Sequence, residues 1–165
     1  MKRRELLRNG LAAGIAALTL GGCGFHLRGN EQNHRLPALT LTGDTTSPFA
    51  REFRASVEFS DVELRADAPW VVTLGTPRLL ERRLGADDRA SNEHELSLEV
   101  EIALQARDTG AYHLHPSLLR ETTRLRLSDD DLLNRETLIS DAVDELSQRL
   151  ARRALERLAN IESWR

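Results

Sequence analysis

The sequence predicts an α+β domain: a two-layer sandwich in which a four-stranded, mostly antiparallel sheet has two α-helices packed on one face. Two observations lead to this prediction. Several stretches alternate apolar and polar residues with the period of a strand, and two stretches repeat apolar residues at helical spacing. The elements follow in the order strand, helix, three meandering strands, helix, which is typical of a two-layer α+β domain.

The first strand and the first helix are expected near the start of this domain. Residues 38–42 alternate and predict the strand. The helix is expected to begin at Ser47-Pro48, because serine is a good N-cap and proline is favoured at the first helical position. Three apolar residues four positions apart give this helix one apolar stripe, up to about residue 60: Phe49, Phe53 and Val57.

Three further strands and the last helix complete the prediction. The second strand runs from residue 70 to 83, and Pro77 is expected to place it at a sheet edge or to interrupt it with a bulge, because proline cannot donate to the ladder. Residues 95–107 alternate most clearly, with one apolar and one charged face. A fourth strand follows at residues 118–127. Apolar residues at helical spacing predict a long helix from about Asn134 to the C-terminus.

The only cysteine, Cys23, marks the end of an export signal. A basic segment precedes an apolar run at residues 11–20, which is too short to span a bilayer. Leu20-Gly21-Gly22-Cys23 then matches what a lipoprotein signal peptidase needs: an apolar residue, two small residues and the thiol that carries the diacylglycerol. The less favoured alternative is a buried cysteine after an ordinary cleavage site. The paired arginines of the basic segment fit twin-arginine export and an ordinary signal about equally.

The chain is therefore expected to divide into three parts. Residues 1–22 form a cleaved signal peptide, residues 23–36 a lipidated tether, and residues 37–165 a single domain. Acylation of both the sulfur and the amine of Cys23 would place several chains, palmitate among them, in one leaflet, which anchors a protein stably without crossing the membrane. Gly24 is not the acidic residue that retains lipoproteins in the inner membrane, so we expect sorting to the outer membrane.

Composition argues against several classes of function. The signal contains four of the 23 basic and one of the 26 acidic residues, which leaves 19 basic and 25 acidic residues and a net charge of −6 in the mature protein. That balance argues against a general nucleic-acid binder. The sequence has no Gly-x-Ser-x-Gly, Walker or His-Glu-x-x-His motif, so we expect neither an enzyme nor a cofactor. His113-x-His115 offers two metal ligands from one strand face but lacks partners, and no metal site is expected.

Arginines are the remaining candidates for binding. Arg82, Arg83 and Arg89 gather around the hairpin tip at residues 85–92, and Arg135 opens the last helix. Guanidinium groups bind phosphate with two parallel hydrogen bonds, which suits a phosphorylated glycolipid head. A second group on one strand face is better explained as a solvated sheet face paired with Glu95, Glu99 and Glu101 across the strands: Arg120, Arg124 and Arg126.

The residues that follow the cleavage site resemble the start of a known family. Cys23-Gly24-Phe25-His26-Leu27-Arg28-Gly29 is similar to the opening of the mature LPS-assembly lipoproteins of the LptE family. The resemblance implies a lipid-anchored protein on the periplasmic side of the outer membrane, which sits inside the LptD β-barrel, plugs it, assists its assembly and helps to deliver lipopolysaccharide (LPS) to the outer leaflet. It also implies direct LPS binding by basic residues, for which Arg89 and Arg135 are the nearest counterparts.

Two other functions stay open at this point. One is a free periplasm-facing lipoprotein that binds another envelope ligand, such as a glycan. The other, with less support, is an envelope hydrolase whose site the sequence does not reveal. A partner of a barrel predicts co-purification with that barrel, a free binding module predicts a monomer, and a hydrolase predicts turnover that one substitution abolishes.

Overall fold

The structure is a computed structural model that describes residues 36–84, 91–128 and 132–161. Its elements, in chain order, are β1 (Leu39–Gly43), α2 (Pro48–Phe59), β2 (Trp70–Leu74), β3 (Arg78–Leu84), β4 (Ser91–Ala106), β5 (Tyr112–Ser128) and α3 (Leu132–Ala159). The expected signal peptide, Cys23 and Arg89 lie outside the described residues.

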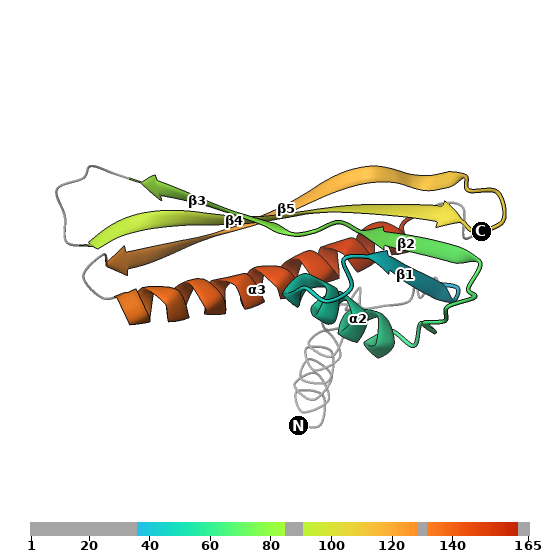
Figure 1. The fold of residues 1–165 in the computed structure, drawn as a ribbon, viewed down its shortest axis with the longest axis horizontal. Coiled ribbons are helices and arrows are strands. Elements are labelled where there is room, and N and C mark those ends of the chain that lie inside the picture. The colour runs from blue at the N-terminus through green and yellow to red at the C-terminus, as the bar shows by residue number, and fades with distance from the viewer. Residues whose placement is uncertain (1–35, 85–90, 129–131, 162–165) are drawn as a thin grey trace, which may run out of the picture. The chain divides into compact units, whose positions relative to one another are not determined.

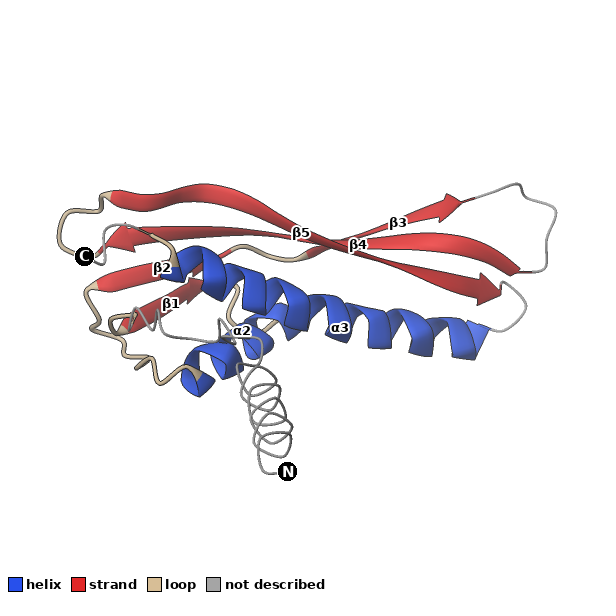
Figure 2. Ribbon diagram, turned by 180° about the vertical axis from the view of Figure 1, so that it is seen from behind, coloured by secondary structure: helices blue, strands red, loops and turns tan. Residues whose placement is uncertain are grey.

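Both described helices cover the same face of one sheet (Figures 1 and 2). β1 pairs in parallel with β2, and β2 pairs antiparallel with β4. β3 pairs antiparallel with the other half of β4 along the same edge, and β5 pairs antiparallel with the opposite edge. The predicted α+β class, with two helices and a mostly antiparallel sheet, is confirmed. The parallel pair is possible because α2 forms the crossover between β1 and β2.

The sheet has five strands, so the predicted number of four is wrong. Residues 70–83 form two strands, β2 and β3, because the chain bulges between them. Leu74 lies opposite Ile102 and Arg78 lies opposite Glu99. The segment that connects β2 to β3 therefore has one more residue than the part of β4 that it faces. Pro77 lies in this segment, where its missing N–H interrupts no ladder bond. The expected interruption at Pro77 therefore divides the strand in two.

β5 begins at Tyr112, six residues before the predicted start of the fourth strand. Pro116 does not end the strand, because a second bulge accommodates it. Ile102 lies opposite Ser117 and Leu104 lies opposite Leu114, which again leaves one extra residue, here on β5. Bulges of this kind are common on edge strands, and β5 has β4 as its only partner among the described strands.

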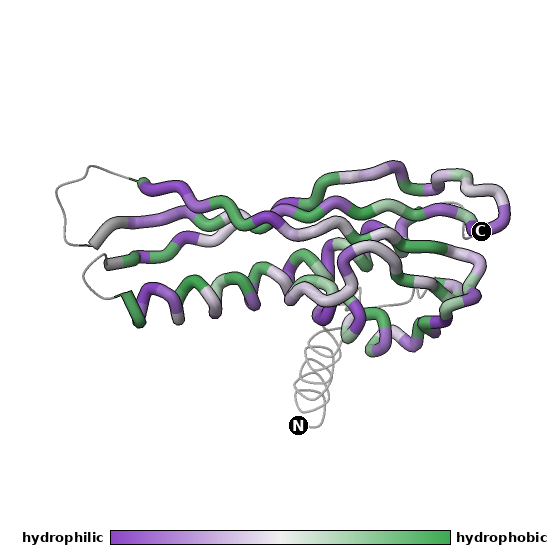
Figure 3. Tube along the Cα trace, in the orientation of Figure 1, coloured by the Kyte–Doolittle hydropathy of each residue, from purple (hydrophilic) through white to green (hydrophobic). Residues whose placement is uncertain are grey.

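The core lies between the helices and the helix-facing side of the sheet. Apolar and polar residues alternate along much of β4 (Figure 3), and the apolar ones at every second position are buried: Leu96, Leu98, Val100, Ile102 and Leu104. On α2, Phe49 and Phe53 are fully buried with ring centroids 6.0 Å apart. Leu36, which precedes β1, is also buried in this core. The largest side chains from β4 and α3 in the core are Leu96, Ile102, Leu104, Leu146, Leu150 and Leu158.

A tight turn connects β1 to α2. Gly43 has a φ of 82°, and a Cβ at this position would lie 2.2 Å from the carbonyl oxygen of Leu74, so only glycine fits. The Asp44 carboxylate then accepts hydrogen bonds from the backbone N–H groups of Thr46 and Ser47, each at 3.1 Å. The Ser47 hydroxyl accepts from the N–H of Ala50 at 3.3 Å, which confirms the predicted N-cap.

The Asp44 turn predicts a pH dependence of stability. The backbone hydrogen bonds from Thr46 and Ser47 hold the pKa of Asp44 below its ordinary value of 3.8. A lowered pKa in the folded state means that the carboxylate stabilises the fold above the unfolded pKa, and that this contribution is lost as the pH falls below about 3.8. We expect Asp44→Ala to lower the free energy of unfolding at pH 7. The difference in this free energy between the wild type and the variant should become smaller below pH ~4.

Urea unfolding of the wild type and the variant at a series of pH values measures this difference. Asp141→Ala, on the exposed face of α3, is the matched control and should show no such trend. A difference between wild type and Asp44→Ala that stays constant from pH 7 to pH 3 would contradict the assignment.

Candidate functional site: the arginine-rich end of the sheet

The end of β3, the start of β4 and the start of α3 lie at the same end of the sheet (Figure 1), and three of the predicted arginines belong to these segments: Arg82, Arg83 and Arg135. Strand alternation separates two of them. Arg83 lies opposite His94, which is buried under the helix layer, whereas Arg82 lies opposite Glu95 on the outer face. Arg82 and Arg83 are neighbours in the sequence but therefore lie on opposite faces of the sheet.

On the helix-facing side, four residues form what we name the tip cluster: Glu81, Arg83, His94 and Arg135. The Arg135 Nη2 donates a hydrogen bond of 2.6 Å to Glu81 Oε1, which ties the first turns of α3 to β3. The Nδ1 of His94 also lies 2.6 Å from Glu81 Oε1, but without the alignment of a hydrogen bond. The cluster therefore places one guanidinium group and an imidazole at the Glu81 carboxylate, with Arg83 on the same face of the sheet opposite His94.

On the outer face, charged residues form what we name the outer ladder: Arg78, Arg82, Glu95, Glu99, Arg120 and Arg124. Its acids lie on the central strand β4, and its arginines lie on the two flanking strands. Arg82 donates to Glu95 at 2.7 Å, and Arg120 lies 2.6 Å from Glu99. Arg78 reaches the other oxygen of Glu99 at 3.3 Å.

The outer ladder confirms that strand arginines pair with Glu95 and Glu99 across the sheet. The Glu99 side chain is only 7 % exposed, whereas that of Arg120 is 55 % exposed. Because the acids lie beneath the arginines, the solvent side of this face presents mostly guanidinium groups. The arginines of the ladder are largely exposed, so we expect the ladder to set the charge of this surface.

Exposed apolar side chains lie beside the tip cluster. Leu132 and Leu133, which open α3 just before Arg135, are 66 % and 80 % exposed. A solvent-exposed pair of leucines next to basic groups is an amphiphilic surface. Its chemistry matches a ligand that carries both anionic groups and hydrocarbon.

The sequence identified Arg83 and Arg135 but not the residues that join them. Glu81 and His94 are distant in sequence from Arg135, and only the fold brings them together. A signal for His94 exists, because it occupies an apolar position in the alternation of β4 that Leu96 and Leu98 continue. Arg89, the fourth predicted ligand-binding residue, lies outside the described residues.

The two candidate metal-binding histidines contact separate aromatic rings. His113 meets Trp70 edge to face at 4.5 Å between ring centroids, and His115 stacks on Tyr112 at 5.1 Å. Within residues 36–84, 91–128 and 132–161, no three His, Cys, Asp or Glu side chains are grouped to hold a metal ion. None of the helices in these ranges is both long enough and apolar enough to cross a membrane.

Comparison with known proteins gives relatives in sequence. No protein-family model matches the chain. It is 29 % identical over 155 residues to the LPS-assembly lipoprotein LptE of Photorhabdus laumondii, across 90 % of this chain and 81 % of that protein. It is 30 % identical over 107 residues to the LPS-assembly lipoprotein LptE of Pectobacterium atrosepticum, across 59 % of this chain and 58 % of that protein.

Solved structures share the fold. A lipoprotein B from Nitrosomonas europaea aligns with a TM-score of 0.65 at 15 % identity, across 86 % of this chain and 94 % of that chain. The minor lipoprotein of Acinetobacter baumannii gives 0.60 at 17 % identity, with coverages of 74 % and 90 %. The rare lipoprotein B of Shewanella oneidensis gives 0.58 at 22 % identity, with coverages of 76 % and 96 %. The resemblance expected from residues 23–29 is confirmed along most of the chain: this protein is similar to the LptE family of LPS-assembly lipoproteins.

Proposed function

We propose that this protein is an outer-membrane lipoprotein that partners and plugs the LptD β-barrel, assists its assembly and helps to deliver LPS to the outer leaflet. The observation that carries the proposal is the sequence similarity to LPS-assembly lipoproteins, which extends over 90 % of this chain. Two of the solved structures that share its fold are those of lipoproteins. The role is one of shape and binding, and the proposal includes no catalytic step.

The anchor is proposed to be Cys23, lipidated on the periplasmic side of the outer membrane. The residues before it have the order that lipoprotein processing requires. Two or more acyl chains would hold the protein stably, whereas one chain binds a membrane only marginally. The folded domain would then remain on the periplasmic side, tethered through residues 23–36.

Direct LPS binding is proposed for basic residues at the end of the sheet: Arg82, Arg83, Arg89 and Arg135. The tip cluster supports Arg83 and Arg135 in particular, because they lie on one face beside the exposed Leu132 and Leu133. Guanidinium groups suit the phosphates of LPS, and leucines suit its acyl chains. Arg82 faces the other way and its guanidinium is bonded to Glu95, so it would contribute less.

Depletion of the protein in its own host tests the proposal. Placing the gene under a repressible promoter should lower the amount of LPS at the cell surface and stop growth. The surface LPS is measured with a membrane-impermeant label, and total LPS is measured in parallel. Re-expression of the wild-type chain should restore both. Normal growth with an unchanged surface fraction of LPS after depletion would contradict the proposed role.

A further inference from the structure

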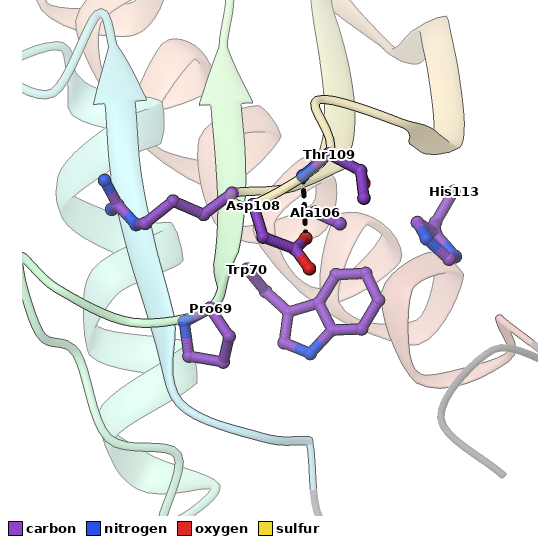
Figure 4. A pocket seen from close by; sticks show the side chains of 7 residues that line it. Pro69, Trp70, Ala106, Asp108, Thr109 and His113 are labelled. Atoms are coloured by element: carbon purple, nitrogen blue, oxygen red, sulfur yellow. Dashed lines mark hydrogen bonds between the residues drawn. The ribbon is translucent and has the colours of Figure 1, made fainter.

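A pocket of about 570 Å³ lies at the opposite end of β4 from the tip cluster (Figure 4). It forms where β2 begins, β4 ends and the turn into β5 starts. Its volume is within the roughly 300–1,000 Å³ that is typical of small-molecule sites. The residues that line it are Pro69, Trp70, Ala106, Arg107, Asp108 and Thr109, together with His113.

Aromatic rings gather at this end of the sheet. The indole of Trp70 forms a wall of the pocket, and the imidazole of His113 meets it at 4.5 Å. Tyr112 lies next to His113 in β5 and stacks on His115. The whole chain has one tyrosine and two tryptophans, so two of these three residues lie here. Trp70 is half-buried and packs partly against the core, whereas Tyr112 is exposed, so this end of the sheet presents aromatic surface to the solvent.

Polar atoms at the pocket have unused hydrogen-bonding capacity. Asp108 accepts the N–H of Thr109 through Oδ1 at 2.8 Å, and its Oδ2 bonds to no residue that the structure describes. Neither ring nitrogen of His113 makes a hydrogen bond within the described ranges. One carboxylate oxygen and one imidazole therefore remain available to a ligand beside the indole.

Arg107 lines the pocket, but its guanidinium is committed to the neighbouring loop. Its Nε donates to the carbonyl of Ala68 at 2.7 Å, and its Nη2 donates to the carbonyl of Ala66 at 2.8 Å and to the hydroxyl of Thr40 at 2.7 Å. These bonds fix the turn that presents Asp108. They also place a permanent positive charge at the edge of the pocket.

We propose that this pocket binds a pyranose ring of an envelope glycan. The apolar C–H face of a sugar can lie on the indole of Trp70, while its hydroxyls donate to Asp108 Oδ2 and bond to the imidazole of His113. A cationic ligand fits less well, because Arg107 and His113 are basic and a single indole makes an incomplete aromatic box. This site is separate from the arginines proposed for LPS and does not depend on them.

Calorimetric titration of the full-length protein in detergent tests the site. Two probes distinguish the possible sources of the sugar: a trisaccharide of N-acetylglucosamine, and LPS oligosaccharide freed of acyl chains and phosphates. Saturable binding of one of the two probes is expected. The probe that binds shows whether the sugar comes from an N-acetylglucosamine polymer or from LPS. Removal of the phosphates prevents the tip arginines from contributing to the signal.

Variants assign the binding to the pocket. Asp108→Asn and His113→Ala alter exposed side chains and should each weaken binding about tenfold, because a hydrogen bond to a charged or polar group is lost. His115→Ala, on the same strand but outside the pocket, is the matched control and should change the affinity by less than about twofold. In a Trp164→Phe background, Trp70 is the only tryptophan. Its fluorescence should change as the sugar is added, with the same midpoint concentration as the calorimetric titration.

Absence of binding by both probes at millimolar concentration would overturn the proposal. Equal affinity of the wild type, Asp108→Asn and His113→Ala would overturn it too. Neither result would affect the proposed partnership with the barrel, which is measured by co-purification.

Discussion

Replacing Cys23 with alanine, in a protein produced in excess of the LptD barrel, is expected to move the surplus protein from the membrane to the soluble periplasmic fraction. Each buried CH₂ of an acyl chain contributes about 0.8 kcal/mol to membrane binding, so loss of all the chains removes nearly the whole affinity. The variant must carry a secretory signal with an Ala-x-Ala cleavage site, because an uncleaved signal would itself stay in the membrane. Fractionation followed by immunoblotting measures the change.

Two substitutions at Gly24 are the controls for this experiment. Gly24→Ala keeps Cys23 and should leave the protein in the outer membrane. Gly24→Asp places an acidic residue directly after the cysteine and should retain the protein in the inner membrane. If Cys23→Ala protein produced in excess of the LptD barrel still stayed entirely with the outer membrane after a carbonate wash, the lipid anchor would not be at Cys23.

The double variant Arg83→Ala/Arg135→Ala is expected to weaken LPS binding by about tenfold or more. Charge-assisted hydrogen bonds contribute about 1.5–3 kcal/mol each, and this variant removes both described arginines of the tip cluster. The fold should survive, because Arg135 and Glu81 are partly exposed and such a pair contributes about 1 kcal/mol or less. Capture of purified protein on immobilised LPS at several salt concentrations measures the affinity.

A charge-matched variant on the outer face makes this prediction specific. Arg124→Ala/Arg126→Ala removes two positive charges from the opposite side of the sheet and should leave LPS binding within about twofold of the wild type. Equal losses in the two double variants would mean that LPS responds to net charge and not to the tip cluster. Thermal unfolding of each variant shows whether it is folded.

The local elements of the fold could be predicted because their patterns are complete within short stretches. Ser47-Pro48 and the apolar stripe of α2 were sufficient for the first helix, and β2 begins at Trp70, where the second strand was predicted to begin. The bulges at Pro77 and Pro116 were harder. Pro77 indicated an interruption, but whether one strand or two results depends on the register with β4, which no local pattern contains. Residues 112–117 were not predicted as part of β5, because whether a strand continues past Pro116 also depends on its register with β4.

The types of residue at the candidate site could be predicted from the sequence, but their arrangement in space could not. Arginines at a hairpin tip and at a helix start are visible in the sequence, and two of them lie together in the tip cluster. The separation of Arg82 from Arg83 follows from strand alternation, but the face that each one takes depends on where α3 packs. The contact of Arg135 with Glu81 joins residues 54 positions apart, which is beyond the reach of local spacing.

The measurement that tests the central proposal most directly is purification of the C-terminally tagged protein from detergent-solubilised outer membranes at native expression. We predict that a β-barrel protein of translocon size elutes with it in a one-to-one ratio, and that mass spectrometry identifies this barrel as LptD. Recovery of the lipoprotein alone in mild detergent would contradict the partnership and leave a free, ligand-binding lipoprotein as the better explanation.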